Sequence, residues 1–136
     1  MNTARIVLII DDDPDDVEFF TEALEKVQAG ATCYAKSNGQ EGMNFLLNPR
    51  NPLPDFIFLD LNMPLMNGKQ CLREIRRSKR LKNIPVIIYS TSRQKSDEEE
   101  TKKLGADEFI TKPARFEDLC SMLFSCFKKY GYRSEA

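Results

Sequence analysis

The sequence contains no histidine, and its four cysteines show no CxxC or CxxH spacing. The lack of histidine excludes a catalytic Ser-His-Asp triad, a His-ligated zinc site and a role as a phosphohistidine carrier. Cysteines without such spacing are typical of reduced thiols that serve as small apolar residues. This use of cysteine predicts a cytoplasmic protein, because reduced thiols persist in that compartment.

Long apolar runs and a strong net charge are missing as well. Runs such as IVLII and VIIY end after four or five residues, far short of the roughly 20 residues that a membrane-spanning helix needs. The N-terminal MNTAR leads directly into an apolar stretch and has no signal-peptide pattern. The net charge of −1 favours neither nucleic acid nor a membrane surface as a partner.

What the chain does contain is an alternation of two patterns. Short β-branched runs at 5–10, 31–36, 56–60, 85–90 and 107–111 predict five strands, and the stretches between them have helical spacing. With 136 residues, 41% of them hydrophobic, we expect one domain over residues 1–136. Strands that alternate with helices predict an α/β fold, in which helices cover both faces of a parallel sheet.

The predicted helices differ in how well they can pack. The first carries an apolar stripe, and Leu72 and Ile75 point inward from the third, which follows the Asn67-Gly68 turn. The fourth, SDEEETKKLGA at 96–106, has Leu104 as its one large apolar residue. We therefore expect a weakly anchored fourth helix, because helices in proteins are stabilised mainly by packing an apolar face.

Polar side chains gather where the predicted strands end. Because the carboxyl ends of parallel strands meet at one edge, these groups should lie close together. Carboxylates with no protein cation among them are expected to bind a hard divalent ion such as Mg²⁺. One carboxylate oxygen could then attack phosphorus and form an acyl phosphate, while a lysine and a hydroxyl hold the other phosphoryl oxygens. The residues concerned are Asp11 and Asp12, Asp60, Ser90 and Thr91, and Thr111 and Lys112.

The remaining aspartates of the LIIDDDPDD stretch are expected to begin the first helix. Asp13 is predicted to cap the helix, and Pro14 suits the first helical position, where a missing N–H costs nothing. Asp15 and Asp16 fill the first turn, where carboxylates suit the helix dipole.

Four motifs occur in order: DD at 11–12, DLNMPLMNG at 60–68, Ser90 after PVIIY, and KP at 112–113 after GADEFIT. This set resembles the receiver domain of two-component response regulators, the CheY-like superfamily, over about residues 5–128, with a short tail at 129–136. The resemblance implies a (βα)5 flavodoxin-like, doubly wound sheet with strand order 2-1-3-4-5. The STS triplet at 90–92 and the prolines before the third strand look most like single-domain regulators paired with bacterial phytochromes.

The resemblance also implies a role for each site residue. Asp60 would be the phosphoacceptor, and Lys112 its salt-bridge partner. Mg²⁺, or Mn²⁺ in its place, would be held by the carboxylates of Asp11, Asp12 and Asp60 and by the backbone carbonyl of Asn62. Ser90 and Phe109 would be the switch residues, Thr91 would narrow the access to Asp60, and the Lys112–Pro113 bond is often cis in such domains.

These roles imply a regulator rather than an enzyme, apart from its own phosphorylation and dephosphorylation. It would receive a phosphoryl group from a sensor histidine kinase or a histidine phosphotransfer protein and control a downstream protein by a shift between conformations. The kinase, the stimulus and the downstream target are not evident from the sequence.

Three other interpretations fit part of the pattern. Asp11, Asp13, Asp15 and Glu22 match an EF-hand loop, but Asp16 stands where glycine is needed. A haloacid dehalogenase-like phosphatase would use Asp11 as its nucleophile and leave Asp60 without a role. The third interpretation is a receiver-like module that binds proteins without being phosphorylated. The complete set of site residues disfavours this interpretation.

Partner surfaces are expected on the first and last helices. Phe19 lies opposite the core stripe of the first helix and is a candidate contact for a kinase. Met122, Phe124 and Cys126 widen the apolar stripe of the last helix, which suggests a partner or homodimer face formed with the last strand and the fourth helix. The basic stretch at 73–82 is interpreted as a solvated helix face rather than a nucleic-acid site.

Overall fold

In the computed structural model, which describes residues 5–130, five parallel strands form one sheet in the order β2-β1-β3-β4-β5. This confirms the predicted fold class and strand order. The strands are β1 (Ile6–Ile10), β2 (Thr32–Lys36), β3 (Phe56–Leu59), β4 (Val86–Ser90) and β5 (Glu108–Thr111).

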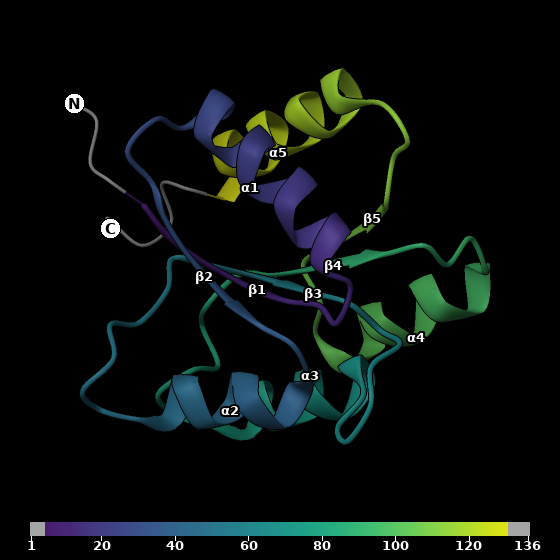
Figure 1. Cartoon of the computed structure of the whole chain (residues 1–136). Coiled ribbons are helices and arrows are strands. Elements are labelled where there is room, and N and C mark those ends of the chain that lie inside the picture. Colours follow the sequence, from purple (N-terminus) through teal and green to yellow (C-terminus); the bar gives the residue numbers. More distant parts are fainter. Residues whose placement is uncertain (1–4, 131–136) are drawn as a thin grey trace.

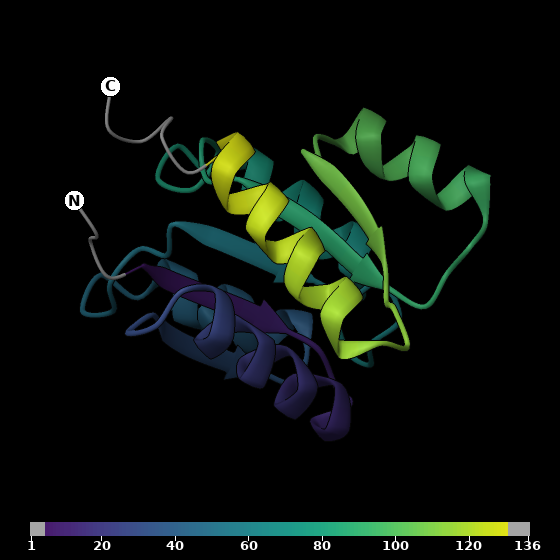
Figure 2. The same cartoon turned by 90° about the horizontal axis from the view of Figure 1, so that it is seen from above.

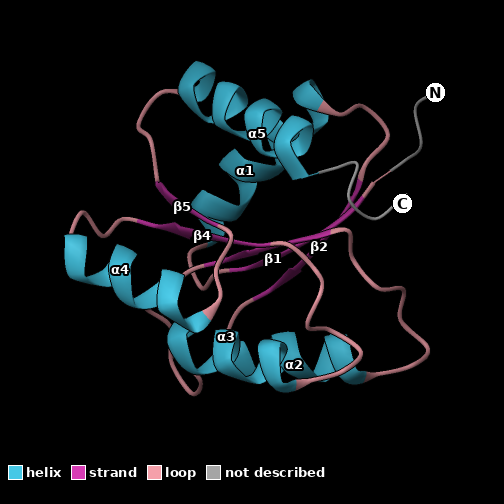
Figure 3. Cartoon of the chain, turned by 180° about the vertical axis from the view of Figure 1, so that it is seen from behind, coloured by secondary structure: helices cyan, strands magenta, loops and turns pink. Residues whose placement is uncertain are grey.

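Helices cover both faces of this sheet. α1 (Pro14–Val27) and α5 (Phe116–Tyr130) lie side by side on one face (Figures 1 and 2). The other face carries α2 (Gly39–Leu47), α3 (Gly68–Arg77) and α4 (Lys95–Leu104), as the view from behind shows (Figure 3). Among residues 5–130 we find no helix with the length and apolar character needed to cross a bilayer.

The central strands divide their side chains between two cores, because successive residues of a strand point to opposite faces. Val7 and Ile9 pack under α1 and α5, whereas Leu8 and Ile10 pack against α2 and α3. Every residue of β3 and β4 is buried. The continuous apolar runs seen in the sequence therefore belong to strands covered on both faces.

The chain enters α1 immediately after β1, through the cap predicted from the sequence. Asp13 Oδ1 accepts hydrogen bonds from the backbone N–H groups of Asp15 and Asp16, at 3.0 and 3.3 Å, and Pro14 begins the helix. This short connection places the first turn of α1 beside the carboxyl end of β1, which matters for the site below.

α4 is anchored mostly by polar contacts, as its sequence predicted. Within α4, Thr101 is the buried side chain. Two cations of α3 hold its ends: Lys69 Nζ lies 2.9 Å from Asp97 and 2.8 Å from Glu100, and Arg76 donates to the carbonyl of Gly105. Because these contacts are partly exposed, they tie α4 to the domain less firmly than an apolar face would.

Candidate functional site

The three predicted metal ligands lie together at the carboxyl edge of the sheet. Asp11 directly follows β1 and Asp60 directly follows β3, and these strands are paired side by side, with Ile10 opposite Leu59. One carboxylate oxygen from each of Asp11, Asp12 and Asp60 lies within 4.8 Å of the others. Asp11 and Asp60 are buried, and Asp12 is exposed, so the cluster is open to solvent on one side.

One oxygen of this cluster is buried without a hydrogen bond. Asp11 Oδ2 receives none from residues 5–130, although Lys112 Nζ lies 2.8 Å away in an ion pair. A buried carboxylate oxygen without a donor is costly unless a cation compensates for it. Three carboxylates whose oxygens lie within 4.8 Å of one another are suitable ligands for a hard divalent ion.

Lys112 is the cation at the centre of the cluster. Its Nζ lies 2.8 Å from Asp11 Oδ2, 2.7 Å from Asp16 Oδ2 and 3.8 Å from Asp60 Oδ2, and its side chain is 8% exposed. The expectation that no protein cation stands among the carboxylates is therefore wrong. The reason is the length of the lysine side chain, which reaches inward from the end of β5 and pairs with both sides of the cluster.

Asp16 is a site residue that the sequence interpretation missed. We assigned it to the helix dipole, whereas its carboxylate bonds to Lys112, 96 positions further along the chain. A signal was available, because a helix that starts two residues after the strand-end aspartates must present its first turn at the same edge.

Burial shapes the protonation of the cluster. Removal from water raises the pKa of Asp60 to about 6, and the neighbouring Asp11 adds to the rise, while Lys112 opposes it. Burial likewise raises the pKa of Asp11, against the lowering effect of Lys112. Burial alone would lower the pKa of Lys112, but its ion pair with Asp11, its hydrogen bond to Asp16 and the charge of Asp60 raise the pKa above the ordinary value, so Lys112 stays charged.

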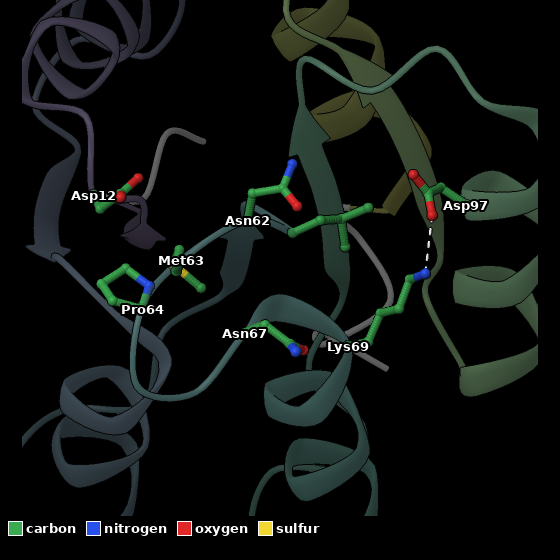
Figure 4. Close-up of a pocket in the computed structure, with 8 residues that line it drawn as sticks. Asp12, Asn62, Met63, Pro64, Asn67, Lys69 and Asp97 are labelled. Carbon is green, nitrogen blue, oxygen red and sulfur yellow. Dashed lines mark hydrogen bonds and ion pairs between the residues drawn. The ribbon is translucent and has the colours of Figure 1, made fainter.

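A pocket of about 460 Å³ opens beside the acidic cluster. Figure 4 shows Asp12 on one side of it, the Lys69–Asp97 ion pair on the other, and Asn62 between them. The pocket lies on the Asp12 side of the cluster, the side that is exposed to solvent. The rest of its lining comes from the β3–α3 loop, namely Leu61, Met63, Pro64 and Asn67.

Ser90 lies at the end of β4 and is fully buried. Its Oγ accepts a hydrogen bond of 3.3 Å from the backbone N–H of Ser92, and Ser92 Oγ donates to Asp97 Oδ2 at 2.6 Å. Asp97 in turn pairs with Lys69. A continuous set of polar contacts thus joins Ser90 to the start of α4, whereas Thr91 is exposed.

Comparison with known proteins places this geometry in a family. Residues 7–124, most of the chain, match the family described as response regulator receiver domain. The chain belongs to that family. It is 33% identical over 129 residues to the sensor histidine kinase CheAY of Helicobacter pylori. The matched region covers 95% of this chain but only 16% of that kinase.

Two solved structures extend the likeness to the whole receiver fold. The phosphorylated cyanobacterial phytochrome response regulator RcpA is 27% identical, covers 94% of both chains and has a TM-score of 0.85. The Mn²⁺-bound response regulator Rcp1, a protein of Synechocystis, is also 27% identical, covers 91% of this chain and 92% of that one, and has a TM-score of 0.81. Structural neighbours of this receiver domain therefore include phytochrome-associated regulators, as the STS triplet suggested.

The family match and the geometry set the other interpretations aside. An EF-hand requires a helix before its loop, but Ile6–Ile10 is a buried strand. The family match favours neither the haloacid dehalogenase-like phosphatase nor the phosphorylation-independent module. Receiver domains are regulatory modules rather than enzymes in the ordinary sense.

Two residues beside the receiver site need separate comment. Phe109, in β5, is half-buried and packs against the core under α3 and α4. The Lys112–Pro113 bond is trans, since no cis peptide bond occurs among residues 5–130. The cis form is thus absent here, in line with the intrinsic preference of X–Pro bonds for trans.

The expected partner surface is smaller than the sequence suggested. Phe124 is 59% exposed and Met122 is half-buried, but Cys126 is buried, with 5% exposure, because it faces the α1–α5 core. Phe19 is half-buried rather than exposed, because its ring packs edge-on against Phe116 at 5.7 Å. Cys126 therefore offers little surface to a partner, although it lines a pocket with Met122 and Ile110, and Phe19 offers only part of its ring.

The basic stretch at 73–82 has a structural use. Arg76 donates to the carbonyls of Gly105, Lys82 and Ile84 and pairs with Asp107 at 3.0 Å. Arg73, Arg77, Lys79 and Arg80 are exposed. The solvated helix face that we expected is thus present, together with one arginine that ties α3 to the turn before β5.

Proposed function

We propose that this receiver domain accepts a phosphoryl group on Asp60, in a Mg²⁺-dependent reaction, from a sensor histidine kinase or a histidine phosphotransfer protein. The phosphorylated form then changes conformation and controls a downstream protein. The observation that carries the proposal is the cluster of Asp11, Asp12 and Asp60 carboxylates, two of them buried, with an Asp11 oxygen that receives no hydrogen bond and a pocket that opens beside Asp12.

The metal would be held by the carboxylates of Asp11, Asp12 and Asp60 and by the backbone carbonyl of Asn62. Oxygen ligands and an open side suit Mg²⁺, and Mn²⁺ can take its place. The Mn²⁺-bound form of Rcp1 supports a divalent ion in a domain of this kind. When bound, the ion would neutralise the carboxylates and the charge that develops on the phosphoryl oxygens.

The chain's own groups prepare Asp60 for the reaction. The backbone N–H of Leu61 donates to Asp60 Oδ1 at 2.9 Å and fixes the orientation of the carboxylate. A carboxylate oxygen of Asp60 attacks phosphorus, the new O–P bond forms as the P–N bond to histidine breaks, and the histidine nitrogen leaves with the electron pair. Lys112 and Ser90 would then contact the other phosphoryl oxygens. Water later cleaves the acyl phosphate and restores the carboxylate.

The response would spread through the contacts that lead away from Ser90. If Ser90 moves toward the phosphoryl group, its bond with Ser92 changes, and Ser92 is bound to Asp97 at the start of α4. Phe109 can turn toward the space that Ser90 leaves. Because α4 has little apolar anchoring, the contacts that Ser90 and Lys112 would make with the phosphoryl group can shift the equilibrium between positions of α4.

We further propose that the output surface is the α4-β5-α5 face, where Met122 lines a pocket with Glu108 and Ile110 of β5 and offers apolar area to a second copy or a downstream partner. Phe124 is exposed about 160° further round α5, so it offers a separate apolar contact. Nucleic acid and membrane are not among the proposed partners. A cytoplasmic location remains a prediction from the cysteine pattern, consistent with four cysteines that are all free.

The test uses phosphoramidate, whose P–N bond resembles that of a phosphohistidine. With Mg²⁺, a phosphate-affinity gel should show a slower band that appears with time, disappears on acid or base treatment as an acyl phosphate does, and is absent with EDTA. Asp60→Asn should show no band. A band of equal intensity in Asp60→Asn, or in EDTA, would refute the proposal.

A further inference from the structure

Lys112 is bound more closely to α1 than to the proposed phosphoacceptor. The side-chain hydrogen bond that it makes within residues 5–130 goes to Asp16 Oδ2, at 2.7 Å. Its contact with Asp60 Oδ2, at 3.8 Å, is too long for a hydrogen bond. The ammonium group that should meet the phosphoryl group therefore starts from a position beyond bonding distance of Asp60.

The two short contacts of Lys112 differ in what a bound cation would do to them. Asp11 belongs to the metal cluster, so a divalent ion there would take over the charge that Asp11 now shares with Lys112. Asp16 lies outside the cluster, and its side chain is 33% exposed. Asp16 thus remains as a partner for Lys112 after the metal ligands are occupied.

We propose that Asp16 is a positioning residue that competes with the phosphoryl group on Asp60 for the Lys112 ammonium. This rests on the proposed function of Asp60. Asp16 holds Lys112 against the first turn of α1 in the unphosphorylated protein, and the phosphoryl group must draw it away. The strength of the Asp16–Lys112 contact consequently sets part of the stability of the phosphorylated form.

Among the acidic residues at the start of α1, Asp16 is the one whose carboxylate contacts Lys112. Asp15 precedes it in the same turn and is exposed, and Asp13 caps the helix through the N–H groups of Asp15 and Asp16. The third residue of the helix reaches back toward the carboxyl end of β1, because side chains tilt toward a helix N-terminus. Asp16 is the carboxylate of α1 that meets the lysine at the end of β5.

The experiment measures the affinity for beryllofluoride, a phosphoryl analogue, by calorimetry at saturating Mg²⁺, so that metal affinity does not enter. Asp16→Asn should bind beryllofluoride roughly three- to tenfold more tightly than the wild type, because a partly exposed charged hydrogen bond no longer restrains Lys112. Asp16→Glu, which can restore the contact, should return the affinity toward that of the wild type. If Asp16→Asn does not fold, Asp16→Ser takes its place.

Asp15→Asn is the matched control, since it removes the same charge one residue earlier without touching Lys112. An affinity that is unchanged or weaker in Asp16→Asn, or an equal gain in Asp15→Asn, would overturn the role of Asp16 while leaving Asp60 as the phosphoacceptor. A wild-type domain that binds no beryllofluoride with Mg²⁺ would overturn the proposed function and this inference with it.

Discussion

Asp60 is a buried carboxyl group, and its burial affects how the stability of the domain depends on pH. In the fold its pKa is raised to about 6, mainly by burial, from an ordinary value of 3.8. A carboxyl group whose pKa is raised on folding stabilises the protein while it is protonated, and that contribution is lost as the pH rises through the folded pKa. Without metal, ionised Asp60 should therefore destabilise the domain near neutral pH.

Asp60→Asn removes this cost. In EDTA, its free energy of unfolding relative to the wild type should increase between about pH 4 and pH 7 and approach roughly 3 kcal/mol, the equivalent of about two pKa units. Urea denaturation at several pH values measures the difference. Added Mg²⁺ should shrink it by stabilising the wild type. A difference that is constant from pH 4 to pH 7 would contradict the raised pKa of Asp60.

Gly68 is the residue that allows the β3–α3 loop to close over Asp60. A Cβ at this position would collide with the Asp60 carbonyl oxygen and lie 2.7 Å from Leu61 Cα, and neither backbone atom can move aside freely. Gly68→Ala should destabilise the domain by about 1–3 kcal/mol and reduce the rate of phosphoryl uptake. Thermal denaturation and the phosphoramidate assay measure the two effects.

Gly30→Ala is the comparison for that variant. Gly30 has a φ of +88°, so alanine strains the backbone there too, but no other heavy atom lies within 4 Å of the added Cβ. It should lower stability while phosphoryl uptake by the folded protein stays at the wild-type rate. Equal loss of uptake in both variants would show that Gly68 acts only through general stability.

At the residue scale, the sequence predicted the aspartates at the strand ends but not their full set of partners. Asp11, Asp12 and Asp60 could be placed together because parallel strands end at one edge. The place of Asp16 at the same edge could be predicted, but its partner could not, since that depends on how far Lys112 reaches across the sheet. The burial of Cys126 and the packing of Phe19 on Phe116 depend on the rotation of α5 against α1, which one-helix periodicity does not specify.

At the scale of elements, α4 differs from the other helices in what holds it. Its periodicity has no apolar stripe, so the weak anchoring was predictable from its own sequence. The cations that hold it, Lys69 and Arg76, come from α3. Their role was not predictable, because the charges on α3 looked like an ordinary solvated face.

Lys69→Met should loosen the start of α4. The two ion pairs of Lys69 are partly exposed and worth about 0.5–1 kcal/mol together, so amide hydrogen exchange at the start of α4 should speed up about two- to fivefold. Exchange in β3 and β4 should stay as it is. Arg73→Met, an exposed change on the same helix, is the control. Unaltered exchange in α4 would show that Lys69 does not anchor it.

At the scale of the whole molecule, the fold separates the proposed phosphorylation site from the proposed output surface. The acidic cluster lies at the carboxyl edge of the sheet, and Met122 of α5 lies beside Glu108 and Ile110 of β5, on the proposed α4-β5-α5 face. The overall α/β order followed from the alternation of patterns along the chain. Dimerisation through that face depends on contacts between two molecules, and the residue pattern of a single chain does not specify those contacts.

Sedimentation tests this face. With Mg²⁺ and beryllofluoride the wild type should dimerise, and Met122→Ser should dimerise more weakly because it loses apolar area beside β5 from the contact. Phe19→Ser, on α1, is a control away from the proposed face. A wild type that stays monomeric with and without the analogue would contradict a dimer.

The central claim is that Asp60 takes the phosphoryl group with the help of a divalent ion. Intact mass after incubation with acetyl phosphate and Mg²⁺ tests it most directly, followed by borohydride reduction and peptide mapping to locate the acyl phosphate. One phosphoryl group should be added at Asp60, and this addition should depend on the metal and be absent in Asp60→Asn. A phosphoryl group mapped to Asp11, or one that persists in Asp60→Asn, would contradict it.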